Sequence, residues 1–473
     1  MNKKIVINPL TRISGFMEID VYIENNRVVD AKTKGHLFRG FEQMLVGRSP
    51  FDAVYFTQRI CGICSAAHSI ASSLALEDAL NIHPLEQGRY LRDIIHCCEF
   101  LQNHVRHFYQ YTVPDYVKLE SNSLFNTDHH DFRLPKQIND RISRHYFESL
   151  EYSRLAHQML AILGGKAPHN HGVFIGGITT QATAENVVKL DDSLQKISRF
   201  INDKMIPDAY DIAAYYSDYY RLGGGYGNLL TYGAFNNYKD LGTLYVDPLI
   251  SKMNANNNLV EPFQEKNIKE KIDYSWYKAS NAAYRPDSEM AEPDMEMNEK
   301  AYSWVKAPRY EGLPFEVGPL ARLILSGEYQ NGISAMDRTL ARALEAKKIC
   351  EIMKELLHSV IPNVDLQKAY EIPEQASGRG LVDTIRGALG HWLKVENKKI
   401  SFYQIITPST WDFSTKDDLG YRGVAEEALI GTPINDPNNP AEVGRILRSF
   451  DPCMSCATHV YSPGKQMKTI KVF

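Results

Sequence analysis

Near the start of the chain, apolar and polar side chains alternate one by one, which is typical of a β-strand with one buried face. The apolar side consists of Met17, Ile19, Val21 and Ile23. Asn25-Asn26 is a favourable hairpin turn, and Val28-Val29 begins the return strand. The pattern predicts a small antiparallel sheet near the N-terminus.

Farther along, apolar residues recur about every 3.6 positions, the period of an amphipathic helix. The clearest run covers 85–111, where this spacing is followed by Leu91, Ile94, Ile95, Cys98, Leu101, Val105 and Phe108. The same period predicts helices at 139–163, 184–217 and 335–360. Residues 251–300 are polar, rich in Asn, Glu and Lys, and we expect a surface excursion there. We therefore predict an α+β fold that is mostly helical, with a bundle of long helices as its core.

The chain shows no internal repeat and no clear linker, so we expect a single domain over 1–473. Within it we expect an N-terminal sheet region at 1–80, a helical core at 81–380 and a C-terminal region at 381–459, followed by 460–473. The composition is 44% hydrophobic and 23% charged, which is ordinary for a globular protein.

Charge and hydropathy exclude some classes of function. The chain has 53 basic and 57 acidic residues and a net charge of −4, which argues against a nucleic-acid partner. No apolar run approaches the roughly 18 residues of a membrane helix. The first residues contain no signal-type apolar stretch, so we expect no export signal in this chain. Its placement is then cytoplasmic, or at a membrane through a partner.

The chain has seven cysteines, too few for a disulfide scaffold of this size. Cys61 and Cys64 form one C-x-x-C pair, and Cys453 and Cys456 form another near the opposite end. The two sulfurs of such a pair converge on one ion when the backbone turns between them, and Gly62 permits that turn. If the pairs share a site, both ends of the chain meet at a buried metal.

Four thiolates suit a soft or borderline metal, which leaves zinc, nickel or an iron–sulfur cluster. A structural zinc site is one interpretation, because zinc is the commonest occupant of four-cysteine sites. However, Cys61 and Cys453 are 392 residues apart, far more than a zinc ribbon spans. Asp451 and His459 also offer ligands that a closed zinc site does not need. Spacing alone leaves the metal open.

Longer segments around and between the pairs narrow the choice. Arg59-Ile60-Cys61-Gly62-Ile63-Cys64 is followed by His68, and the second pair lies in Asp451-Pro452-Cys453-Met454-Ser455-Cys456-Ala457-Thr458-His459. Further segments are Asn8-Pro9-Leu10-Thr11-Arg12-Ile13, Gly35-His36-Leu37-Phe38-Arg39-Gly40-Phe41-Glu42, Ser303-Trp304-Val305-Lys306-Ala307-Pro308-Arg309-Tyr310, Glu316-Val317-Gly318-Pro319, Arg386-Gly387-Ala388-Leu389-Gly390-His391-Trp392 and Thr407-Pro408-Ser409-Thr410-Trp411. In this order, over almost the whole chain, they resemble the large subunit of nickel–iron hydrogenases.

The resemblance implies that the four thiolates hold a nickel–iron centre whose iron carries carbon monoxide and cyanide. Cys61 and Cys453 would be terminal on nickel, and Cys64 and Cys456 would bridge the two metals. The implied reaction is H₂ ⇌ 2H⁺ + 2e⁻, in which the metal acts as a Lewis acid and a base takes a proton. Cys456 would be the first proton acceptor, with Arg386 above the open site.

Three other residues take roles from the resemblance. Arg386 and Ser409 stand where the family places donors to the cyanides, and His68 would donate toward the bridging sulfur. Without the resemblance, His68 would be interpreted as a core histidine. The remaining cysteines lie in helical patterns, and we expect them to pack in the core, as buried thiols do: Cys97, Cys98 and Cys350.

A second, harder metal is also implied, usually magnesium. Its ligands would be Glu42, His459 and the backbone carbonyl of Ile405, completed by waters. An oxygen-rich shell fits magnesium, and the imidazole also admits iron or zinc. Without the resemblance, Glu42 would be interpreted as a surface residue and His459 as a packing histidine.

Three positions depart from the family pattern. Ser14 replaces a glutamate that acts as a proton gate, Asn103 replaces an aspartate, and Ile385 replaces the proline before Arg386. A serine hydroxyl can relay a proton but cannot store one near pH 7. Glu18, four residues on and on the same side of the strand, is a candidate substitute.

The resemblance also implies partners. Once the four cysteines are used, no cluster ligands remain, so an iron–sulfur small subunit would carry the electrons. His459 marks where family precursors are cut, so 460–473 would be an extension removed by a processing protease after maturation factors insert nickel. A permanent C-terminal strand is the alternative. Two other functions stay open: a hydrogen sensor with slow turnover, and a structural zinc protein or quinone-binding relative.

Overall fold

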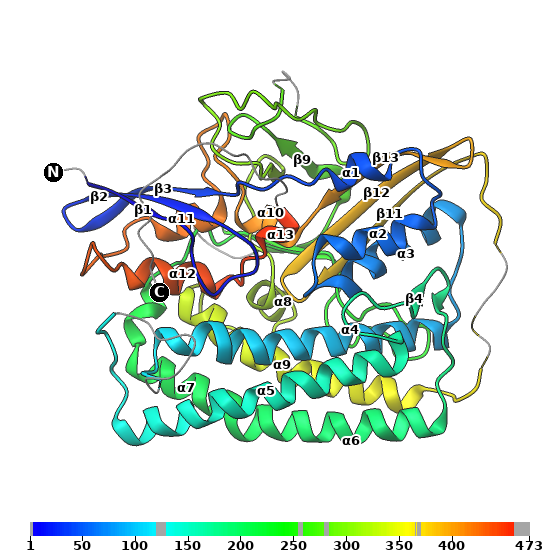
Figure 1. Cartoon of the computed structure of the whole chain (residues 1–473), viewed down its shortest axis with the longest axis horizontal. Helices are drawn as coiled ribbons and strands as arrows, with labels where there is room; N and C mark the ends of the chain where they lie inside the picture. The colour runs from blue at the N-terminus through cyan, green and yellow to red at the C-terminus, as the bar shows by residue number, and fades with distance from the viewer. Residues whose placement is uncertain are drawn as a thin grey trace.

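The structure is a computed structural model that describes residues 3–119, 129–253, 259–278, 283–364, 366 and 370–457, except the side chains of 456 and 457. Long helices pack beside several small antiparallel sheets (Figure 1), which confirms the predicted α+β class. The α-helices are α1 (Phe41–Leu45), α2 (Asp52–Thr57), α3 (Ser65–Leu80), α4 (Glu86–Arg106), α5 (Lys136–Gly164), α6 (Ala184–Phe200), α7 (Ile206–Tyr215), α8 (Pro319–Leu325), α9 (Ala335–Ser359), α10 (Pro408–Asp412), α11 (Val424–Leu429), α12 (Ala441–Ser449) and α13 (Met454–Ala457).

Strands and short turns complete the described part of the chain. The strands are β1 (Lys3–Ile7), β2 (Glu18–Glu24), β3 (Arg27–Lys34), β4 (Val173–Phe174), β5 (Gly177–Ile178), β6 (Leu229–Thr231), β7 (Leu249–Lys252), β8 (Leu259–Pro262), β9 (Ile268–Lys271), β10 (Ala307–Tyr310), β11 (Gln375–Thr384), β12 (Gly387–Glu396) and β13 (Lys399–Ile406). The 3₁₀ and π segments are η1 (Gln58–Ile60), η2 (His107–Thr112), η3 (Val113–Asp115), η4 (Ile201–Met205), η5 (Ser217–Arg221) and η6 (Glu265–Asn267). Among the described helices, none is long and apolar enough to cross a membrane.

The four helices predicted from periodicity are present. The run at 85–111 is α4 continued by the π segment η2, and the run at 184–217 is α6, η4 and α7 in succession. Helix α4 packs between α5 and α9, and α5 also packs on α6. These helices form the lower layer in Figure 1.

Strands β1, β2 and β3 pair in that order as an antiparallel sheet. Asn25 and Asn26 turn the chain between β2 and β3 with φ of 49° and 58°, a conformation that asparagine tolerates better than most residues. Ile19, Val21 and Ile23 are buried, as the alternation predicts. The polar side is buried too, because Glu18 and Asp20 both pair with Lys34 at 2.7 Å.

The sheet β11-β12-β13 was not anticipated, and it positions the site. Helix α3 packs directly on β11 because two glycines let the backbones touch. A Cβ atom on Gly378 would lie 2.3 Å from the carbonyl oxygen of Ala75, and one on Gly380 would lie 2.0 Å from that of Ala71. Helix α3 starts after Cys64, and the turn from β11 to β12 carries Arg386, so this packing fixes the two relative to each other.

Residues 251–300 are not only a surface excursion, and that expectation is corrected. Their described part contributes β9 to a two-stranded sheet with β10. Trp276 and Tyr277 are buried in an apolar cluster with Trp304 and Phe38. Single aromatic residues spaced among polar ones supply this core without producing a periodic pattern.

Candidate metal centre

Three of the four predicted cysteine ligands lie together. The sulfurs of Cys61, Cys64 and Cys453 are all within 4.8 Å of one another, and the side chains are buried. The Sγ atoms of Cys61 and Cys453 are 3.4 Å apart, although 392 residues separate them in sequence. Thiolates that share a metal at about 2.3 Å have spacings of this order. The described residues thus include one point that three soft ligands can share.

Two other predicted ligands, Cys456 and His459, lie at or beyond the C-terminal end of the described residues. Cys456 belongs to α13, which begins one residue after Cys453, but its side chain is outside the described residues. His459 and the predicted extension at 460–473 are also outside them.

The first cysteine pair, Cys61 and Cys64, lies between the end of η1 and the start of α3. Cys61 follows η1 in an extended conformation, with φ of −148° and ψ of 136°. The backbone N–H of Ile63 donates to its sulfur at 3.3 Å. Cys64 is the N-cap residue of α3, so the helix starts where this sulfur is presented. The short loop from Cys61 to Cys64 therefore keeps the sulfurs of both residues close together.

The second pair is held by the beginning of the chain. Ser14 and Cys453 form a parallel β-bridge, in which Ser14 N donates to Pro452 O at 3.1 Å and Met454 N donates to Ser14 O at 2.7 Å. Ser409 Oγ accepts from Cys453 N at 3.0 Å. The Ser14 hydroxyl is buried and has no hydrogen-bond partner among the described residues.

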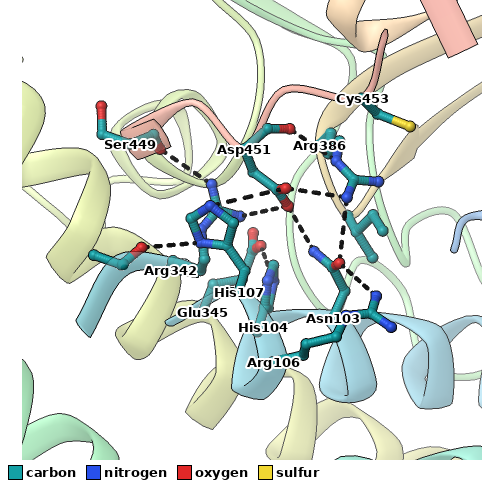
Figure 2. Close-up of polar contacts among 12 residues, drawn as sticks. Asn103, His104, Arg106, His107, Arg342, Glu345, Arg386, Ser449, Asp451 and Cys453 are labelled. Carbon is teal, nitrogen blue, oxygen red and sulfur yellow. Dashed lines mark hydrogen bonds and ion pairs between the residues drawn. The ribbon is translucent and has the colours of Figure 1, made fainter. Parts of the chain in front are cut away.

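Arg386 is fixed beside the cysteines by Asp451 and Asn103 (Figure 2). Its Nε donates to Asp451 O at 2.8 Å, and its Nη2 donates to Asp451 Oδ1 at 3.0 Å and to Asn103 Oδ1 at 3.3 Å. Burial would lower the pKa of Arg386, but Asp451 and the cysteine thiolates raise it above its ordinary value. Burial would raise the pKa of Asp451, but Arg386 and His107 hold it well below its usual range. The guanidinium is therefore a fixed positive charge.

A small cavity separates these groups. It is lined by Cys64, Ala67, His68, Thr384, Arg386, Leu389, Pro408, Ser409 and Cys453. The lining combines two thiols with apolar carbons and few donors. Arg386 Nη1 is buried without a hydrogen-bond partner among the described residues, so this N–H donor is available to an acceptor bound in the cavity. Soft ligands, an enclosed space and an uncommitted donor fit a nickel–iron centre with small diatomic ligands.

His68 belongs to a buried chain of polar side chains. Its Nδ1 is 3.2 Å from His391 Nε2, His391 Nδ1 is 2.9 Å from the Tyr403 hydroxyl, and Tyr403 donates to Ser72 Oγ at 3.1 Å. Burial lowers the pKa of His68 to about 4 and holds the pKa of His391 well below its ordinary value, so both rings are neutral at pH 7. His391 therefore holds the orientation of the His68 ring, and the donation from His68 toward the bridging sulfur stays a prediction.

One face of α4 reaches the cysteine segments, and sequence reasoning missed two of its residues. Glu99 accepts from the N–H groups of Ala66 and Ala67 at 2.7 and 2.9 Å, and Gln102 donates to Ile63 O at 3.1 Å. Burial raises the pKa of Glu99 to about 8, although the two N–H groups act in the opposite direction. The available signal was their position, because Glu99 and Gln102 follow Ile95 and Cys98 by four residues and so lie beside the apolar residues of the predicted helix.

At the predicted second metal, Glu42 lies beside Ile405. Glu42 Oε1 accepts from Ile405 N at 3.0 Å, and Lys306 Nζ is 3.7 Å away. Lys306 is also paired with buried Glu270 at 2.9 Å, and Gln404 donates to the same carboxylate. The structure brings Glu42 and the Ile405 backbone together among polar groups.

Glu18 does not fit the role of proton store. Burial would raise its pKa, but hydrogen bonds from His36 and Lys34 lower it to about 2. Asn8 Nδ2 donates to its second oxygen at 2.6 Å. A carboxylate held in this way stays ionised near neutral pH.

The remaining three cysteines are buried in helices α4 and α9, and burial raises the pKa of each thiol. They are Cys97, Cys98 and Cys350. Their environment agrees with the expected packing role.

Comparisons with known proteins agree with the site. A family described as nickel-dependent hydrogenase matches residues 39–127, 121–332 and 327–459. The chain is 34% identical to the periplasmic [NiFeSe] hydrogenase large subunit of Desulfomicrobium baculatum, over 97% of this chain and 95% of that one. It is 28% identical to the hydrogenase-2 large chain of Escherichia coli, over 100% of both chains.

Solved structures give the same result. The Ni-Fe-Se hydrogenase from D. vulgaris Hildenborough in the reduced state superposes with a TM-score of 0.92 at 36% sequence identity. The match covers 97% of this chain and 100% of that one. The similarity therefore extends over the whole fold and is not confined to the cysteine segments.

Proposed function

Because this chain belongs to the nickel-dependent hydrogenase family, as a large subunit, we propose that it oxidises H₂ reversibly and passes the electrons to an iron–sulfur small subunit. The observation that carries the proposal is the convergence of Cys61, Cys64 and Cys453 beside the uncommitted donor of Arg386. With Cys456, these residues would hold a nickel–iron centre. The related structures are named for selenium as well, whereas all four candidate ligands here are cysteine.

When bound, the metal centre supplies a Lewis acid that polarises H₂. The residues of this chain supply fixed charge, a hydrogen-bond donor and an enclosed pocket. Arg386 places a fixed cation and a donor at the cavity, Asp451 balances its charge, and the apolar lining excludes water. A thiolate would take the first proton, and we assign this role to Cys456.

Arg386 and Ser409 both line the cavity, which supports their role as donors to cyanide ligands on iron. His68 lines it as well, with its orientation held by His391. Apolar carbons of Leu389 and Pro408 lie among these groups, as carbon monoxide would require.

We assign the second metal, magnesium or iron, to Glu42, the Ile405 carbonyl and His459. The pairing of Glu42 with Ile405 N supports the assignment, because it holds a carboxylate against that backbone segment. Glu270 and Gln404 would then orient bound water through hydrogen bonds.

The proposed electron route needs a partner. Among the described residues, the one group of three or more candidate metal ligands is the cysteine cluster itself, and we propose that a small subunit supplies the relay of iron–sulfur clusters. We also propose that maturation factors load the metals and that a protease removes 460–473. Ser14 and Asn103 favour a second candidate, a hydrogen sensor with the same centre and slow turnover.

Metal analysis and infrared spectroscopy of the purified complex test the proposal. We expect nickel and iron in equal amounts and sharp bands in the metal-carbonyl and cyanide region. A zinc-only protein without such bands would refute it. Hydrogen-dependent reduction of a dye then separates a fast enzyme from a slow sensor.

A further inference from the structure

A single face of α4 contacts the segments that carry both cysteine pairs. Glu99 binds the start of α3, Gln102 donates to Ile63 O between the first two cysteines, and Asn103 donates to Asp451 Oδ2 at 2.7 Å. All three side chains are buried. Glu99 differs from the other two because it carries an acid into the core, which is costly unless both oxygens are hydrogen-bonded.

The start of α3 explains why an acid is needed there. The first N–H groups of a helix have no partner within the helix, and the N-cap side chain usually accepts from one of them. Thr183 does so for α6 and Ser334 does so for α9. The N-cap residue of α3 is Cys64, which makes no such bond because its sulfur belongs to the cysteine cluster.

Glu99 supplies the missing cap from the neighbouring helix. Its two oxygens accept from Ala66 and Ala67, the second and third residues of α3, at 2.7 and 2.9 Å. Two bonds to one rigid planar group fix both the position and the rotation of this helix end. Cys64 is joined directly to the fixed turn, so its sulfur is fixed with it.

We propose that Glu99 is a positioning residue of the metal centre, which holds the ligand Cys64 by clamping the first turn of α3 from α4. The proposal rests on the proposed function, because it assumes that Cys64 binds metal. It extends that function by assigning a role to a residue that is not among those lining the cavity.

The test uses the purified complex with Glu99→Gln, which keeps the size of the side chain but offers one acceptor instead of two. Glu426→Gln is the matched control, because Glu426 is also a buried acid that accepts from two backbone N–H groups, that of Thr33 in β3 and that of Gly423, the N-cap residue of α11. We expect both variants to lower the thermal midpoint. Only Glu99→Gln should shift or split the infrared bands and release nickel to a chelator about tenfold faster or more.

Wild-type bands and nickel release in a folded Glu99→Gln complex would overturn the proposal. If that variant does not fold, Glu99→Asp decides, because it keeps two acceptors but withdraws them by about 1.5 Å. Shifted bands and faster nickel release in Glu99→Asp support the clamp, and wild-type values overturn it. Absence of nickel and of bands from the wild-type complex would instead refute the proposed function.

Discussion

Replacing Arg386 by lysine tests the most specific part of the site. The arginine makes three hydrogen bonds through Nε and Nη2 and leaves Nη1 buried without a partner among the described residues. Lysine has a single nitrogen, which cannot hold Asp451 from two directions and also present a donor at the cavity. Loss of one preorganised donor near a reacting centre lowers turnover by about 10² to 10³-fold.

The assay compares hydrogen-dependent dye reduction per nickel in the wild type and in Arg386→Lys. Arg338→Lys is the control, because Arg338 is an equally buried arginine bound to Glu316 by two hydrogen bonds away from the cavity lining. Loss of a charge-assisted hydrogen bond costs about 1.5 to 3 kcal/mol of stability in either variant. Only Arg386→Lys should also lose turnover, with nickel content retained.

Unchanged turnover in a fully nickel-loaded Arg386→Lys complex would refute this reasoning. A similar loss in Arg338→Lys would also refute it, since the effect would then follow from general destabilisation.

Three other predictions follow from the surrounding structure. Ser14→Glu adds a buried carboxyl beside Cys453 and should raise hydrogen turnover at an unchanged infrared spectrum, whereas an unaltered rate would show that protons leave by another route. The pKa of Glu18 is about 2, against an ordinary value of 4.5, so the ionised carboxylate stabilises the fold above pH 4.5 and this stabilisation is lost as the pH falls toward 2. In urea unfolding, Glu18→Gln should therefore reduce the change of the midpoint between pH 4.5 and 2, and a curve of midpoint against pH parallel to that of the wild type would contradict this. Gly380→Ala places a Cβ atom 2.0 Å from the carbonyl oxygen of Ala71, so it should destabilise the fold by about 1 to 3 kcal/mol, seen as a lower thermal midpoint, and should weaken nickel retention. An unchanged thermal midpoint would contradict the close packing of α3 on β11.

The helices could be predicted because their apolar residues recur with the helical period. In α4 and η2, the spacing from Leu91 to Phe108 gave this signal, although α4 is buried on nearly all sides and its polar residues are buried as well. Strand β12 is different, since residues such as Leu389, Trp392 and Leu393 are buried on both of its faces, which removes the alternation that marks a strand. Its glycines weakened the strand pattern further.

The three candidate ligands that the structure brings together, Cys61, Cys64 and Cys453, were likewise visible in the sequence, because metal chemistry restricts both residue type and spacing. The groups that hold them were not. Glu99 and Gln102 act on backbone groups of a distant segment, and a backbone N–H leaves no trace in residue identity. The low pKa of Glu18 could not be predicted either, because it depends on side chains of another segment, those of Lys34 and His36.

The β-bridge between Ser14 and Cys453 has a consequence for the order of folding. Joining Cys61 to Cys453 closes a loop of 392 residues, at an entropic cost of about 5 kcal/mol for an unstructured chain. This entropic cost falls once the intervening helices and sheets have formed, because they shorten the effective loop between Cys61 and Cys453. The pocket is therefore closed late in folding, when the segment around Cys453 pairs with the segment around Ser14, and a fragment that ends before Cys453 cannot complete the cysteine cluster.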